Sequence, residues 1–373
     1  MDIKELEKWT NAFGPSGYER EVALMVKDYI TPYADEVLQD KTGSVIFKKG
    51  TKGPKIMIAG HIDEIGFIIT GINSEGFLTF NQLGGWWDQV LLGQRVEIRI
   101  RDGTKIMGII CSKPPHVLAE EERTKVVTKA NMFIDVACKS KKEVEALGLE
   151  IGDPVVPYAK FETLKRTQLI KDENGGKAKE QPVTLAIGKA FDDRIGTFII
   201  AEVLKRLKNE KIEHPNQVYG VATVQEEVGL RGARTSAQLI QPDIGFALEV
   251  DIAGDVPGVK NTDAPSVLSG GPSILAADGS MLANPQLRYF VLDIAKEKGI
   301  KVQHSILGRG GTDAGVMHQT GAGCPSLVFG ISTRHIHSHY GILDLGDVEK
   351  CIDLFVEVIK RLDQKTVDSF TQL

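Results

Sequence analysis

Helical and strand patterns alternate along the C-terminal half of the chain. In several segments apolar residues recur every three or four positions, which predicts helices, and the short apolar runs between them predict buried strands. The expected helices are residues 195–207, 232–240, 285–298 and 345–362, and the expected strands are 218–224, 244–250, 302–306 and 326–329. This alternation is typical of an α/β fold with a parallel or mixed β-sheet that helices cover on both faces.

The N-terminal segment continues the same kind of pattern. Ile3, Leu6 and Trp9 have helical spacing, and a second helix is expected after the Gly-Pro-Ser-Gly sequence at residues 14–17. The apolar run at residues 55–60 is bounded by proline and glycine and suits a strand buried on both faces of a sheet. We therefore expect residues 1–69 to join residues 188–373 in one α/β domain.

Residues 70–187 have a different character. Apolar and polar residues alternate strictly over residues 96–101, and turns that contain glycine, such as residues 101–104, separate short strand patterns. A stretch of this length is too long for a structureless loop within a compact domain. It predicts a small β-rich module inserted into the α/β domain, which is then discontinuous in sequence.

The composition narrows the class of protein. With 42% apolar residues, 25% charged residues and a net charge of -5, the chain lacks the basic excess that binding to nucleic acid requires. No apolar run approaches the length that spans a membrane, and charged residues interrupt the first positions, where a secretory signal would be apolar. We therefore expect a cytoplasmic protein that binds neither nucleic acid nor membranes. The four cysteines lie far apart, which indicates reduced thiols: Cys111, Cys138, Cys324 and Cys351.

Polar side chains gather where the predicted strands end. In open α/β sheets the ligand crevice lies beyond the carboxyl ends of the strands, so residues at these positions are candidates for function. They contain histidine and carboxylate side chains without cysteine, which suits zinc, cobalt or manganese better than copper(I) or an iron–sulfur cluster. Five segments qualify: residues 60–64, 191–194, 225–229, 248–251 and 334–339.

The first two segments combine an imidazole with carboxylates. His61 and Asp63 fall on one face if the segment is extended, so Asp63 is expected to accept a hydrogen bond from the ring nitrogen that a metal leaves free. A solvated histidine in a loop is the alternative. Asp192 and Asp193 precede a predicted helix, where one carboxylate can cap the helix N-terminus while the other binds metal.

Two adjacent glutamates follow the predicted strand 218–224. At the end of a buried strand, Glu226 and Glu227 repel each other and lose solvation unless cations compensate or one of them binds a proton. One glutamate can bind metal while its neighbour acts as a general base toward a water molecule. Glu249 and Asp251 share a face at the end of the next strand, and either could be a further ligand.

The last candidate segment contains three histidines. His335, His337 and His339 share one face if their segment is extended, and their place after a buried strand favours metal binding over a solvated tract. A ligand set with three carboxylates carries about three negative charges, which two divalent ions and a hydroxide nearly balance. The candidate ligands of this two-metal site are His61, Asp192, Glu227, Glu249 and His337.

Taken together, these segments resemble a known family over nearly the whole chain. The family is the TET-type dinuclear metallo-aminopeptidases, also labelled glutamyl aminopeptidase, deblocking aminopeptidase and cellulase M. No single motif is specific for this family, but the motifs in this order are. The motifs are Ala-Gly-His-Ile-Asp-Glu-Ile-Gly at residues 59–66, Phe-Asp-Asp-Arg-Ile-Gly at 191–196, Gln-Glu-Glu-Val-Gly at 225–229, Gly-Gly-Thr-Asp-Ala at 310–314 and Thr-Arg-His-Ile-His-Ser at 333–338.

The resemblance assigns roles to the candidate residues. It implies that Asp192 bridges two metals, that Glu226 is the general base and that Asp63 supports His61. It places His61 and Glu249 on one metal, and Glu227 and His337 on the other. It also implies that the inserted module is a small β-barrel dimerisation domain and that dimers assemble into a hollow dodecamer.

Two positions depart from the family pattern. The family commonly has aspartate where Glu249 stands, and it often has proline and a nearby glutamate where His339 follows Ser338. His116 matches a family loop that approaches the site of a neighbouring subunit, although an exposed turn is the alternative interpretation.

The expected function is a metal-dependent aminopeptidase that releases N-terminal residues from short peptides through a water activated by two divalent ions. A glycoside hydrolase is an alternative, since paired carboxylates also cleave sugars. A metal-stabilised scaffold without activity is another.

Overall fold

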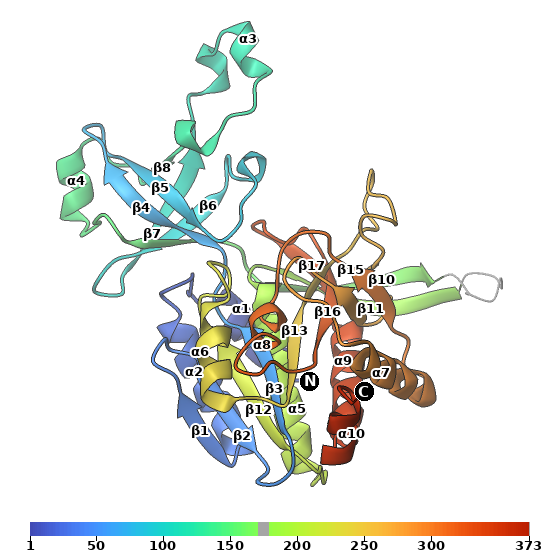
Figure 1. The fold of residues 1–373 in the computed structure, drawn as a ribbon. Helices are drawn as coiled ribbons and strands as arrows, with labels where there is room; N and C mark the ends of the chain where they lie inside the picture. Colours follow the sequence, from blue (N-terminus) through green and yellow to red (C-terminus); the bar gives the residue numbers. More distant parts are fainter. Residues whose placement is uncertain (171–178, 373) are drawn as a thin grey trace.

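The computed structural model describes residues 1–170 and 179–372. These residues form a large mixed β-sheet with helices on both faces, and a closed β-barrel that projects from this body (Figure 1). The expected α/β class with an inserted barrel is confirmed.

Four parallel strands form the centre of the main sheet. The strand order is β1-β2-β12-β3-β13-β16-β17-β11-β10, with β14 and β15 joined through β16. β12, β3, β13 and β16 run parallel to their neighbours, whereas the strands on either side pair antiparallel. The carboxyl ends of the four central strands therefore meet at one edge. The strands are β1 (Glu36–Gln39), β2 (Val45–Lys49), β3 (Lys55–His61), β10 (Glu162–Ile170), β11 (Lys179–Gly188), β12 (Gln217–Thr223), β13 (Ile244–Ile252), β14 (Ser273–Ala277), β15 (Gln303–Ile306), β16 (Ser326–Arg334) and β17 (Gly341–Asp344).

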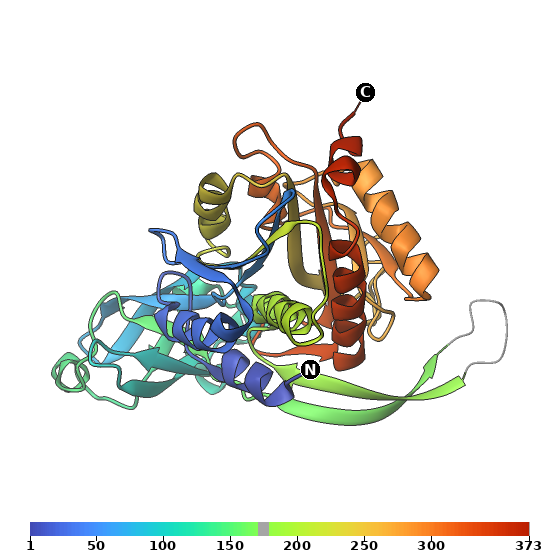
Figure 2. The same ribbon diagram turned by 90° about the horizontal axis from the view of Figure 1, so that it is seen from below.

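Helices cover both faces of this sheet (Figure 2). α5 and α9 pack on one face, with α1 and α2 against α5 and α7 beside α9, while α6 and α8 pack on the other face. Within the described ranges, no helix is long and apolar enough to cross a membrane. The helices are α1 (Ile3–Asn11), α2 (Arg20–Ile30), α5 (Phe191–Asn209), α6 (Arg231–Ile240), α7 (Pro285–Lys298), α8 (Ala314–Met317), α9 (Leu345–Ile359) and α10 (Gln364–Ser369).

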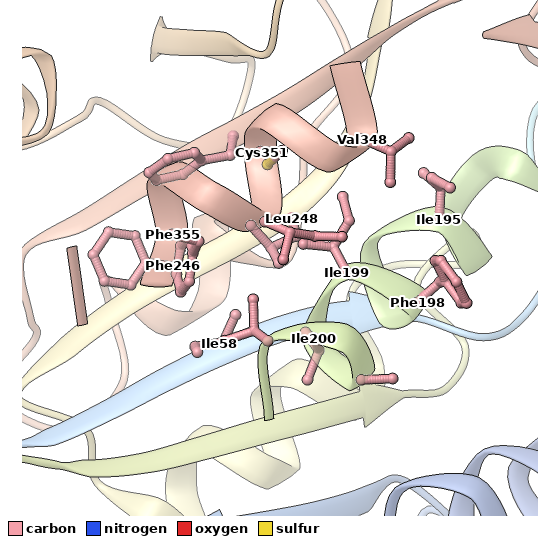
Figure 3. Packing of buried hydrophobic residues seen from close by; sticks show 14 of the residues in the cluster. Ile58, Ile195, Phe198, Ile199, Ile200, Phe246, Leu248, Val348, Cys351 and Phe355 are labelled. Atoms are coloured by element: carbon pink, nitrogen blue, oxygen red, sulfur yellow. The ribbon is translucent and has the colours of Figure 1, made fainter. Parts of the chain in front are cut away.

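The core between α5, α9 and the sheet holds the central parallel strands in place. Phe246 of β13 is fully buried, and its ring centroid lies 5.8 Å from that of Phe329 in β16 and 5.0 Å from that of Phe355 in α9. Ile199 and Leu248 fill the space between α5 and β13 (Figure 3). Because edge-to-face aromatic pairs pack with defined geometry, this core holds neighbouring strands in register.

The barrel has a hydrophobic core of its own. Its strand order is β4-β5-β8-β7-β6-β9, and β4 pairs with β9 to close it. Inside, the ring of Phe67 stacks on that of Trp86 with the centroids 4.7 Å apart. A segment with the short helix α3 extends away from the barrel (Figure 1). The elements are β4 (Gly66–Ile72), β5 (Phe77–Leu83), β6 (Arg95–Arg99), β7 (Lys105–Cys111), α3 (Glu120–Arg123), β8 (Phe133–Asp135), α4 (Lys141–Ala146) and β9 (Pro154–Pro157).

The expected bounds of the insertion, residues 70–187, require correction. The barrel strands lie between Gly66 and Pro157, whereas β10 and β11 form a hairpin that extends the main sheet through β17. Alternating apolar and polar residues are typical of a barrel strand and of an antiparallel edge strand alike. The sequence pattern therefore could not separate the hairpin from the barrel.

Candidate metal centre

The candidate residues meet where the four parallel strands end. His61 is the last residue of β3, Glu249 lies in β13, and Glu226 and Glu227 follow β12. They line a cavity of about 600 Å³, together with residues from the start of α5 and the segment after β16. From the candidate set, the cavity wall contains His61, Asp192, Glu226, Glu227, Glu249 and His337.

Two glycines allow α5 to begin directly against these strand ends. A Cβ atom at Gly60 would lie 2.5 Å from the main-chain nitrogen of Thr197, and one at Gly196 would lie 2.0 Å from the carbonyl oxygen of Leu248. Any side chain at either position would push the helix away from β3 and β13. The close approach brings Asp192, near the start of α5, next to His61.

The carboxylate of Asp192 lies between the two histidines. Its Oδ1 is 3.0 Å from Nε2 of His61, and its Oδ2 is 3.2 Å from Nε2 of His337. Glu226 Oε2 lies 3.6 Å from the same nitrogen of His61, and Glu227 Oε2 lies 3.8 Å from that of His337. Ligand atoms of His61, Asp192 and Glu227 all lie within 4.8 Å of one another, close enough to hold one metal ion.

A second group of possible ligands includes a residue that the sequence did not single out as a ligand. His61, Asp193 and Glu249 also bring ligand atoms within 4.8 Å of one another. Asp193 is completely buried; its Oδ2 accepts a hydrogen bond from the main-chain nitrogen of His61 and its Oδ1 one from that of Gly196. The bond to Gly196 fits the capping role left open for one aspartate of the pair. The peptide bond between Asp192 and Asp193 is cis.

The electrostatics of the cavity favour bound cations. Burial, together with the negative charge of Asp192, raises the pKa of Glu227 to about 8. Burial also raises the pKa of Glu226 and Glu249 well above the ordinary value. Burial opposes protonation of His337, but Asp192 and Glu227 outweigh it and raise its pKa to about 10.

Oε1 of Glu227 is buried and has no hydrogen-bond partner among the described residues. Divalent ions lower the pKa of nearby carboxyl groups and accept unpaired carboxylate oxygens as ligands, so they would offset both features. The residues present therefore fit divalent metal ions.

Asp63 contacts His61, but its carboxylate mainly binds another segment. Nδ1 of His61 lies 3.0 Å from the main-chain oxygen of Asp63 and 3.5 Å from its Oδ1. The carboxylate accepts hydrogen bonds from the main-chain nitrogens of Glu226 and Glu227, at 3.0 and 3.2 Å. Asp63 thus supports the histidine through its main chain and the glutamates through its side chain.

The three histidines near the C-terminus do not share a face. The sequence interpretation required an extended segment. His335 and His337 instead have φ angles of 61° and 54°, so the segment is not extended. His337 points toward Asp192, with its Nδ1 2.7 Å from the carbonyl oxygen of Gly85. His335 is exposed, and His339 is buried against Trp86 with ring centroids 5.4 Å apart.

Glu249 and Asp251, the two alternatives for a further ligand, have different surroundings. Glu249 lines the cavity, whereas the carboxylate of Asp251 accepts hydrogen bonds from the hydroxyls of Ser266 and Ser305. Asp251 is therefore occupied in holding neighbouring segments together. His116 lies in an exposed turn, residues 115–117, that belongs to the segment extending from the barrel.

Comparison with known proteins identifies the family of this chain. The family model of the M42 glutamyl aminopeptidases matches residues 43–174 and 176–354. The putative aminopeptidase FrvX of Escherichia coli is 36% identical over 372 residues, which are 100% of this chain and 99% of that protein.

Two solved structures are also similar. The TET aminopeptidase of a marine sediment Thaumarchaeota archaeon has 51% identity and a TM-score of 0.92, covering 99% of this chain and 98% of that one. The TET1 peptidase of Pyrococcus horikoshii, which can assemble into a tetrahedron or a large octahedral shell, has 30% identity and a TM-score of 0.80, covering 96% and 99%.

These matches extend over nearly the whole chain and confirm the resemblance to the TET-type aminopeptidases. They select peptide hydrolysis over the glycoside hydrolase and over the inactive scaffold. The chain belongs to the M42 glutamyl aminopeptidase family of metal-dependent peptide hydrolases.

Proposed function

We propose that this cytoplasmic aminopeptidase releases the N-terminal residues of short peptides with two divalent ions and with Glu226 as general base. The observation that carries the proposal is the position of Asp192, whose two carboxylate oxygens each face a different histidine. A carboxylate placed in this way suits a bridge between two ions.

The other candidate ligands lie on either side of Asp192. His61 and Glu249 would hold one ion, and Glu227 and His337 would hold the other. Nitrogen and oxygen donors without thiolate suit zinc or cobalt, and manganese is a further candidate. When bound, the ions lower the pKa of a water molecule and polarise the carbonyl group of the substrate.

Glu226 moves the proton. Its carboxylate is buried at the cavity wall, and the main-chain hydrogen bond to Asp63 fixes its position. From there Glu226 accepts the proton of the attacking water and delivers it to the amine that leaves. Asp63 contributes by holding both Glu226 and His61 in place.

Replacing Glu226 with glutamine is expected to lower kcat by about 10² to 10⁴-fold, because the amide has the same size but cannot accept the proton. Turnover of aminoacyl anilides and metal content, measured on one sample, check this. Both metals should remain bound, and carboxymethyl cellulose should not be cleaved by either protein. Glu75→Gln, at an exposed turn of the barrel, is the control. Near-normal turnover by Glu226→Gln would exclude Glu226 as the base.

Replacing His337 with alanine is expected to empty one of the two metal positions, because it removes one ligand of that ion. Metal analysis should give about one divalent ion per chain in the variant and two in the parent protein. His335→Ala is a matched control, since His335 lies two positions away and is exposed. Two full equivalents of metal in His337→Ala would refute the ligand assignment.

The other residues of the cavity wall indicate which N-terminal residues are preferred. Beyond the candidate ligands it is lined by Leu230, Val250, Ile252 and Leu307, and by Arg309 from the glycine-rich segment. Arg309 is exposed, and none of the described residues pairs with its guanidinium. The aliphatic wall suits the methylenes of a glutamate side chain, and the free guanidinium suits its carboxylate.

Arg309→Met is therefore expected to lower kcat/KM for glutamyl anilides by about 10 to 100-fold and to leave leucyl anilides nearly unaffected. The physical reason is the loss of a charged hydrogen-bond donor for the acidic side chain alone. Kinetics with a panel of aminoacyl anilides provide the measurement. An equal loss for both substrates would mean that Arg309 does not select the N-terminal residue.

We further propose that the barrel joins chains into dimers and that the dimers assemble into a dodecamer. Strand β7 of the barrel supports a dimer contact, since its Met107 and Ile109 point outward and are 37% and 44% exposed. Apolar side chains on an outer strand face are typical of a surface that a partner covers.

Changing Met107 and Ile109 together to lysine is expected to lower the assembled mass, because two charges would be buried at the interface. Light scattering of the intact protein measures the number of chains. Glu75→Lys, at an exposed turn of the same module, controls for the same change in surface charge. A dodecamer that persists in the double lysine variant would place the dimer interface elsewhere.

A further inference from the structure

Three successive main-chain N–H groups hold the turn that presents Glu226 and Glu227. The nitrogens of Glu226 and Glu227 donate to the carboxylate of Asp63. The nitrogen of Gln225 donates to Oε1 of Glu19 over 3.0 Å. Gln225 has a φ angle of 55°, in the left-handed region that non-glycine residues adopt only when the surroundings hold them there. The turn therefore depends on two carboxylates from distant parts of the sequence.

Glu19 belongs to a short N-terminal segment, residues 14–19, that forms hydrogen bonds with Asp63 and with Gln225. Oε1 of Glu19 also accepts a hydrogen bond from the main-chain nitrogen of Gly17, over 2.7 Å. The hydroxyl of Ser16 donates to Oδ2 of Asp63 over 2.6 Å. The segment therefore acts on the turn in two ways. Ser16 binds Asp63, which holds Glu226 and Glu227, and Glu19 binds Gln225 directly.

This segment is itself held rigidly. The main-chain nitrogen of Glu64 donates to the carbonyl oxygen of Gly14, and the completely buried guanidinium of Arg194 donates to the carbonyl oxygens of Ala12 and Gly14. Arg194 lies in α5, the helix whose first residues include Asp192. The acceptor that Glu19 offers to Gln225 is therefore fixed relative to the rest of the cavity.

A helix-capping role does not account for the side chain of Glu19. Glu19 directly precedes α2, yet its carboxylate makes no capping hydrogen bond to that helix. It is only 6% exposed and points instead to Gly17 and Gln225. Burying a carboxylate costs free energy, and the hydrogen bonds from the main chain of Gly17 and Gln225 offset that cost.

We propose that Glu19 is a positioning residue for peptide hydrolysis, whose carboxylate holds Gln225 so that Glu226 and Glu227 keep their places at the cavity. The inference rests on the proposed function, in which Glu226 is the base and Glu227 binds metal. Glu19 does not line the cavity and touches no reacting group. Its loss leaves the N–H of Gln225 unpaired, and a shift of the general base by about 1 Å is enough to lower the rate by about 10²-fold.

The test compares two replacements of similar size. Glu19→Gln keeps an oxygen that accepts from Gln225, whereas Glu19→Met offers none. Glu19→Met is expected to lower kcat by about 10 to 100-fold with KM changed by less than about threefold, and Glu19→Gln to restore kcat to within about threefold of the parent. Metal content and the thermal midpoint are measured on each sample. Glu21→Gln is the matched control, because Glu21 lies in α2 and pairs with Arg99 of the barrel.

The outcomes separate this inference from the proposed function. An active Glu226→Gln protein would overturn the proposed base. Parental kcat in Glu19→Met, with Glu226→Gln inactive, would overturn the role of Glu19 alone. An equal loss in Glu19→Gln and Glu19→Met would also overturn it, since the acceptor oxygen would then not matter. If Glu19→Met fails to fold, Glu19→Asp decides: its shorter carboxylate should lower kcat at unchanged KM, and parental kcat would contradict the inference.

Discussion

The concentration of carboxyl groups at the ends of the parallel strands is the constraint on which the rest of the structure depends. Among the described residues, five carboxyl groups from three segments meet there beside two imidazoles: Asp192, Asp193, Glu226, Glu227 and Glu249 with His61 and His337. Without cations, burial and mutual repulsion favour protonated carboxyl groups. Divalent ions would offset that penalty, and these oxygen and nitrogen donors are of the kind that such ions bind.

The fold holds these side chains in place. The parallel strands deliver His61 and Glu249 on a rigid sheet, whose order the aromatic core around Phe246 maintains. Close contacts at Gly60 and Gly196 let α5 bring its aspartates to the strand ends. Main-chain N–H groups that donate to Asp63 and Glu19 set the direction of the two glutamates. A preorganised set of donors loses little conformational freedom when metals bind.

Much of this architecture follows from local patterns. The expected helix at 285–298 coincides with α7, because Asn284 caps it, Pro285 begins it and Gly299 ends it in the left-handed region. The candidate ligands could be named because histidine and carboxylate side chains directly after buried strands have few structural explanations. The spacing of these residues could not predict the aminopeptidase activity. That prediction came from the resemblance to the family, which the comparisons confirmed.

The sequence by itself determined the α/β order, the presence of a β-rich insertion and the residues that gather at the strand ends, because periodicity and strand-end polarity are local properties. Tertiary structure alone decided where the barrel ends, that His337 and not His335 or His339 faces the cavity, and that Asp193 joins the site. It also decided that Glu19 reaches Gln225, across 206 positions of sequence. Such facts depend on backbone turns and on which buried N–H finds which carboxylate, and these pairings are settled only when distant segments pack together.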